Sequence, residues 1–129
     1  MTVTTPQGFR AVGLAAGIKT GGAKDFALVV NDAAAATSAA AAVFTVNRFA
    51  AAPVVLSREA MALAAGGYSV PRAVILNSGG ANACTGQEGY DDAKQTAGAL
   101  ARRLGLRTEE VLVCSTGLIG ERLPVSKLL

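Results

Sequence analysis

Two polar, glycine-containing segments follow apolar runs in this chain, and both could bind a negatively charged group. The first segment, 77–86, lies between the apolar run 73–76 and a helical pattern. Free N–H groups at a helix N-terminus and in glycine-rich backbone bind anions. However, no Lys follows the glycines as in a phosphate-binding loop, and the glycines lack the GxGxxG spacing of a dinucleotide site. A structural turn, in which the side chains of Asn77 and Asn82 bond to nearby backbone, explains the same composition.

The second segment is Ser115-Thr116-Gly117, which follows the apolar run 111–114. A hydroxyl beside a glycine can aim one O–H and one backbone N–H at the same point, which is what an oxyanion hole requires. A plain turn at the end of a strand is the alternative, because Ser-Thr-Gly alone is a weak signal. Neither segment supplies a general base.

The composition excludes several kinds of site. The chain has 129 residues and no His, so it contains no His-based triad, His general base or His-ligated metal. Hydrophobic residues make up 51% of the chain and charged residues 16%, which excludes a disordered protein. Cys84 and Cys114 form no CxxC pair, so we expect two buried free thiols and no metal site.

The charge and hydropathy patterns argue against nucleic-acid and membrane partners. The net charge is +3, and only Arg102 and Arg103 are adjacent among the scattered basic residues. A nucleic-acid binder shows a basic stripe with interleaved aromatic residues. The apolar run 11–18 is interrupted by glycines and is too short to span a bilayer. We therefore expect a soluble, cytoplasmic protein.

Apolar runs and helical patterns occur together along the chain, which predicts a mixed α/β fold in one domain, 1–129. Buried strands are predicted at 26–30, 42–46, 53–56, 73–76 and 111–114. Helices are predicted at 58–65, with Ser57 as N-cap, from a capping box at Thr85–Glu88 to Gly105, and from Pro124 onward. The Ala-rich stretch 33–42 is either a helix or a loop that leads into the next strand.

The two polar segments together resemble motifs of a known family. The sequence Asn77-Ser-Gly-Gly-Ala-Asn-Ala-Cys-Thr-Gly86, followed by Cys114-Ser-Thr-Gly-Leu-Ile-Gly120 and Leu123-Pro124, is similar to the ornithine acetyltransferase (glutamate N-acetyltransferase) family of arginine biosynthesis. The segments 8–11, 17–19, 42–45 and 52–54 resemble the N-terminal region of that family. The resemblance covers nearly the whole chain.

The resemblance implies a layered α/β/β/α fold, of which this chain is an incomplete part. Family members cleave themselves before a Thr, and the α and β chains assemble as an α2β2 heterotetramer. The new N-terminal Thr of the β chain is the nucleophile, and its own α-amino group is the base. The acetyl group moves from N-acetylornithine to this Thr and then to glutamate. No cofactor is expected, although some members also accept acetyl-CoA as acetyl donor.

The resemblance also assigns residues to the active site. It implies that the Thr116 hydroxyl and the Gly117 N–H form the oxyanion hole. It further implies an active-site loop, without individual roles, that contains Asn77, Gly79, Gly80 and Asn82. The family's Met-Thr-Thr-Asp-like cleavage motif does not occur before Leu129. We therefore expect a truncated α-chain portion that lacks the nucleophile and is inactive on its own.

Two alternatives to the acetyltransferase remain open from the sequence. One is a related Thr-nucleophile amidohydrolase or aminopeptidase, which a comparison of hydrolysis with acetyl transfer distinguishes. The other is a non-catalytic module that binds an anion through the segment 77–86, which binding of phosphate or glutamate by the isolated chain distinguishes.

Overall fold

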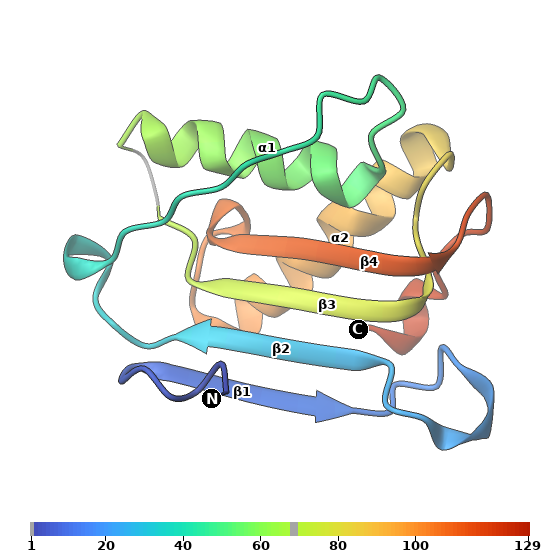
Figure 1. Ribbon diagram of the computed structural model, residues 1–129, viewed down its shortest axis with the longest axis horizontal. Coiled ribbons are helices and arrows are strands. Elements are labelled where there is room, and N and C mark those ends of the chain that lie inside the picture. The colour runs from blue at the N-terminus through green and yellow to red at the C-terminus, as the bar shows by residue number, and fades with distance from the viewer. Residues whose placement is uncertain (1, 68–69) are drawn as a thin grey trace.

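The computed structural model describes residues 2–67 and 70–129 and places one four-stranded sheet beside two α-helices (Figure 1). The strands are arranged in chain order: β1 (Phe9–Leu14), β2 (Phe26–Asn31), β3 (Ala73–Gly80) and β4 (Val111–Leu118). Neighbouring strands from β1 to β3 pair antiparallel, whereas β3 and β4 pair parallel. The helices are α1 (Ala52–Ala65), before β3, and α2 (Gly86–Leu104), between β3 and β4. The predicted mixed α/β class is confirmed.

Both helices pack on the same face of the sheet, where they form the hydrophobic core. Alternate residues of β3 and β4 point toward this face, and Ile75 and Val113 are at most 3% exposed. The residues that meet them from the helices are Leu56 of α1 and Ala93, Ala97 and Ala101 of α2. Because Ala presents only a methyl group, α2 lies close to the strands. No helix of the described residues covers the opposite face of the sheet.

One continuous helix, α1, replaces the predicted strand 53–56 and the predicted helix 58–65. Pro53 lies in the first turn of α1, where its missing N–H costs no helical hydrogen bond. Ser57, predicted as the N-cap, is buried within the helix instead. Its hydroxyl bonds to the carbonyl and the N–H of Val113 in β4, both at 3.2 Å. The short apolar run is consistent with a strand or with the buried side of a helix, so periodicity alone did not separate them.

The predicted strand 42–46 is wrong, and the loop alternative for 33–42 is correct apart from one turn. The Ala-rich stretch contains only the short 3-10 helix Ala35–Thr37. Residues 42–46 pair with none of the described strands, and Val43 and Val46 are each 98% exposed. A β-branched run forms a strand only where a neighbouring strand or packed surface receives it.

The prediction of α2 is confirmed, but its N-terminus differs. Gly105 has the left-handed φ of 67° expected just after a helix, and its N–H bonds to the Ala101 carbonyl. The predicted capping box does not form, because the Thr85 hydroxyl donates to the side-chain oxygen of Asn82 at 2.8 Å. At the C-terminal end, Pro124 precedes a short 3-10 helix, Val125–Lys127, rather than the start of an α-helix.

Two further features differ from the predictions. Strand β1 was not predicted, because its sequence, FRAVGL, shows no regular alternation of polar and apolar residues; in the structure all six residues are exposed. Cys84 and Cys114 are free, as predicted, but exposed rather than buried. Among the described residues, no helix is long and apolar enough to cross a bilayer.

A buried carboxylate fixes the loop between β1 and β2. Asp25 is 3% exposed and accepts hydrogen bonds from the N–H groups of Lys19 at 2.7 Å and Ala16 at 2.6 Å. These bonds, first of all the one from Lys19, hold the pKa of Asp25 below its ordinary value. The same loop carries Ile18, whose side chain lies against Gly79 at the end of β3. Asp25 therefore anchors a loop that contacts the end of the sheet.

The substitution Asp25→Asn is expected to lower the melting temperature at neutral pH, because an amide group then faces two backbone donors. Since the folded-state pKa of Asp25 is lowered, its stabilising effect is present above the unfolded pKa and is lost as the pH falls through the folded pKa. Thermal denaturation at several pH values should show the difference between wild type and variant shrinking in acid. A difference that grows as the pH falls would contradict this role.

Candidate active site

The two segments singled out from the sequence lie side by side at the ends of β3 and β4 (Figure 1). Both segments were predicted as loops, but residues 77–80 and 115–118 are the last residues of these strands. The register pairs three positions across the strands: Asn77 with Ser115, Ser78 with Thr116, and Gly79 with Gly117. The carboxyl ends of adjacent parallel strands meet at one edge of the sheet, which brings the two motifs together.

Gly117 lies where a side chain on β4 would meet the backbone of β3. Its φ of 131° is a conformation that residues with a side chain rarely adopt. A Cβ atom at this position would lie 2.5 Å from the carbonyl carbon of Gly79 and 2.7 Å from the nitrogen of Gly80. The register also shifts here, because Gly80 pairs with both Thr116 and Leu118. Irregularities of this kind bend a strand and change the direction in which its N–H and C=O groups point.

Thr116 borders a pocket of about 260 Å³ at the end of the sheet. The same pocket is lined by Lys24, Asp25 and Ser78. Because side chains alternate along a strand, Thr116 points away from the face that the helices cover. Thr116 and Gly117 are both exposed, so a bound molecule can reach the Thr116 hydroxyl and the adjoining backbone. A hydroxyl and a peptide N–H at adjacent positions are suited to stabilising an oxyanion.

Asn77, Gly79 and Gly80 at the end of β3 lie next to the Thr116–Gly117 pair. Asn77 is 4% exposed. Its side-chain nitrogen donates to the Gly80 carbonyl, and its side-chain oxygen accepts from the Ser115 hydroxyl of β4. A Cβ at Gly79 would lie 2.7 Å from Ile18 Cγ2, and a Cβ at Gly80 would lie 2.9 Å from Leu123 Cδ2. The two glycines therefore let neighbouring segments pack directly against the end of the strand.

Asn82 lies beyond β3 and connects the loop to both helices. It is fully buried and has a φ of 48°, which Asn tolerates better than most residues. Its amide nitrogen donates to the Gly89 carbonyl at 2.8 Å, and its side-chain oxygen accepts from the Thr85 hydroxyl at 2.8 Å. Its backbone carbonyl accepts from the Ala52 N–H at 3.2 Å. These contacts fix the starts of α2 and α1, and Asn82 does not line the pocket beside Thr116.

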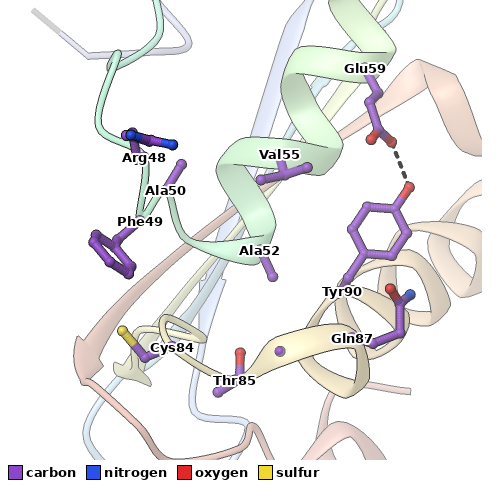
Figure 2. A pocket seen from close by; sticks show the side chains of 11 residues that line it. Arg48, Phe49, Ala50, Ala52, Val55, Glu59, Cys84, Thr85, Gln87 and Tyr90 are labelled. Carbon is purple, nitrogen blue, oxygen red and sulfur yellow. Dashed lines mark hydrogen bonds between the residues drawn. The ribbon is translucent and has the colours of Figure 1, made fainter.

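A larger pocket, of about 460 Å³, lies at the N-terminal ends of α1 and α2 (Figure 2). Its lining includes Arg48, Glu59, Cys84 and Tyr90 but neither Thr116 nor its neighbour Gly117. The Tyr90 hydroxyl donates to the Glu59 carboxylate at 2.5 Å, and this bond raises the pKa of Tyr90. The sequence places Tyr90 only in the apolar stripe of α2. No local pattern indicates this pocket, because segments far apart in the chain form it.

Comparison with known proteins identifies the relatives of this chain. The model of the ArgJ family matches residues 10–129. The chain belongs to the ArgJ family. The arginine biosynthesis bifunctional protein ArgJ of Thermobifida fusca is 57% identical over 129 residues, which are 100% of this chain and 32% of that relative. The ArgJ protein of Mycobacterium tuberculosis is 54% identical over 132 residues, 98% of this chain and 31% of the relative. The chain thus spans about a third of the length of these curated relatives.

A solved structure of the ArgJ family has the same fold. It is the crystal structure of ornithine acetyltransferase complexed with ornithine, from Mycobacterium tuberculosis. The match has a TM-score of 0.88 and 53% sequence identity, and it covers 98% of this chain and 64% of that chain. The resemblance inferred from the two motifs is therefore correct, and so is the fold class that it implied.

The substitution Gly117→Ala tests the close approach of the two strands. The unfavourable φ alone is expected to cost about 1–3 kcal/mol, and contact of the new methyl group with the β3 backbone adds to it. Gly120→Ala is the control, because Gly120 also has a positive φ, 86°, but no atom within 4 Å of its Cβ position. Urea unfolding should show a larger loss of stability for Gly117→Ala, and equal losses would contradict the close approach.

Proposed function

We propose that this chain is the N-terminal part of an ornithine acetyltransferase that moves an acetyl group from N-acetylornithine to glutamate through an acyl-Thr intermediate. In this proposal the chain supplies the oxyanion hole from the Thr116 hydroxyl and the Gly117 N–H. The observation that carries the proposal is the exposed Thr116–Gly117 pair at the parallel strand ends, in a chain 53% identical to an ornithine-bound acetyltransferase.

The chemistry of acyl transfer explains why this pair is suited to the role. The reaction passes through a tetrahedral intermediate whose oxygen carries a negative charge. Donors that are held in place before the reaction stabilise this charge without reorganisation. The packing of Gly117 against β3 holds its peptide in this way, and the Thr116 hydroxyl offers a second donor. The same hole serves both half-reactions: departure of ornithine as the nucleophile is acetylated, and transfer of the acetyl group to glutamate.

The nucleophile and the general base lie outside this chain in the proposal. The chain has no His, and the carboxylate of Asp25 beside Thr116 already accepts two backbone hydrogen bonds. An N-terminal Thr whose own α-amino group is the base needs neither group. Self-cleavage of a longer precursor produces such a Thr at the start of a separate β chain.

The lengths of the relatives support a protein made of two chains. The present chain covers 31% of the curated ArgJ protein of Mycobacterium tuberculosis but 64% of the matched chain in the solved structure from that organism. The chain in the crystal is therefore about half as long as the curated protein. A precursor divided into an α and a β chain accounts for this difference.

The uncovered face of the sheet supports a second layer contributed by the β chain. Val29, Val74 and Leu112 lie side by side on this face, and Leu76 is 38% exposed. Strand faces this apolar are stable when another layer covers them. With the β chain as this layer, the fold becomes α/β/β/α, and two αβ units assemble as an α2β2 heterotetramer. In this proposal the assembled enzyme acts in the cytoplasm and needs no cofactor; whether it takes acetyl-CoA as a second acetyl donor, as some family members do, is decided by the same assay with acetyl-CoA in place of N-acetylornithine.

Acetyl transfer from N-acetylornithine to glutamate by the full-length protein tests the proposal. Thr116→Ala is expected to lower turnover roughly 10²- to 10³-fold, because one oxyanion donor is lost. Thr116→Ser keeps the hydroxyl and should recover most of the activity. The control is Thr37→Ala, which removes a hydroxyl from the 3-10 helix after β2, away from the ends of β3 and β4.

Near-normal turnover of Thr116→Ala would contradict the oxyanion assignment. Release of acetate without transfer to glutamate by the wild-type protein would instead support an amidohydrolase.

A further inference from the structure

A short hydrogen-bonded network lies beneath the Thr116–Gly117 pair. The Ser115 hydroxyl donates to the side-chain oxygen of Asn77 at 2.6 Å, across the gap between β4 and β3. The side-chain nitrogen of Asn77 donates to the carbonyl of Gly80 at 3.1 Å. Asn77 is 4% exposed and Ser115 is half-buried, so water competes little for these bonds.

This network ends on the backbone against which Gly117 packs. The Cβ position of Gly117 lies 2.7 Å from the nitrogen of Gly80 and 2.8 Å from the carbonyl oxygen of Gly79. Gly79 also pairs with Gly117 across the ladder, and Gly80 pairs with Thr116 and Leu118, so a displacement of the Gly79–Gly80 backbone would displace Gly117 as well. Asn77 holds that backbone from the β3 side, and Ser115 holds Asn77 from the β4 side.

We propose that Asn77 and Ser115 are positioning residues that set the orientation of the Gly117 peptide in the oxyanion hole. The inference rests on the proposed function. It assigns a role to the amide of Asn77, which lines the same pocket as Thr116, and to the Ser115 hydroxyl, which lies on the opposite side of β4 from the Thr116 side chain. An oxyanion hole stabilises charge only when its donors are already aimed at the developing oxygen, so small shifts of the peptide weaken catalysis.

The substitution Ser115→Ala in the full-length enzyme tests this role with little risk to folding, because it removes one hydroxyl from a half-buried position. The expected result is a roughly tenfold lower kcat with an unchanged KM for N-acetylornithine, smaller than the about 10²-fold effect of an ångström displacement. Ser115→Thr keeps the hydroxyl and should restore most of the lost kcat. The melting temperature should fall modestly while the protein stays folded, because the side-chain oxygen of buried Asn77 loses one donor.

Ser38→Ala is the matched control. Ser38 also bonds to an asparagine, accepting from the side-chain nitrogen of Asn31 at 3.2 Å, but it follows the end of β2 and lies outside the pocket beside Thr116. Its removal should leave kcat unchanged. A loss of kcat equal to that of Ser115→Ala would show a general structural effect and would overturn the inference.

A double substitution separates positioning from an independent effect. If Ser115 acts through the oxyanion hole, Ser115→Ala combined with Thr116→Ala should lower kcat by less than the product of the two single effects. Losses that multiply in full would overturn the inference. Asn77→Asp, which removes the donor to Gly80, should lower kcat in the same coupled way; if it fails to fold, the Ser115 variants decide.

The outcomes distinguish this inference from the proposed function. If Thr116→Ala loses activity and Ser115→Ala does not, the oxyanion hole stands and the positioning role is overturned. If Thr116→Ala keeps full activity, both are overturned.

Discussion

The close approach of the β3 and β4 backbones at their parallel ends is the constraint on which the rest of this structure depends. At Gly117 there is no room for a side chain, because a Cβ would lie 2.5 Å from the carbonyl carbon of Gly79. Gly117 has a φ of 131°, and the register of the two strands shifts at Gly80. At this strand end Thr116 and Gly117 are exposed, and Thr116 lines a pocket. A strand end built from larger residues could not pack in this way.

The surrounding elements hold this strand end from three sides. The hydrophobic core fixes β3 and β4 under the helices, where Ile75 is 1% exposed. The loop anchored by the Asp25 carboxylate presses Ile18 against Gly79, and Leu123 lies against Gly80. The contacts of Ile18 and Leu123 are made to glycines, which have no side chain to keep these neighbours away. The oxyanion hole that we propose is therefore preorganised by packing, at the one face of the sheet where a further layer and a nucleophile can approach.

Sequence reasoning predicted the parts of this structure that local patterns determine. The cores of β2, β3 and β4 and the C-cap and apolar stripe of α2 follow from apolar runs and helical periodicity, and the family follows from two long motifs. Tertiary packing decided the rest. Pro53 lies in a helix rather than a strand, and Thr85 bonds to Asn82 instead of capping α2. The two motifs were expected in loops, yet they are paired strand ends, because pairing between distant segments leaves no local signal.

A crystal structure of the full-length protein trapped as the acetyl-enzyme tests the central claim most directly. If Thr116 and Gly117 form the oxyanion hole, the acetyl carbonyl oxygen points at this pair and lies within hydrogen-bonding distance of both the Gly117 nitrogen and the Thr116 hydroxyl. The bonds from Ser115 to Asn77 and from Asn77 to Gly80 are then retained next to this pair. An acetyl group attached elsewhere, or a carbonyl oxygen held by other donors while Thr116 and Gly117 make no contact with it, would contradict the account.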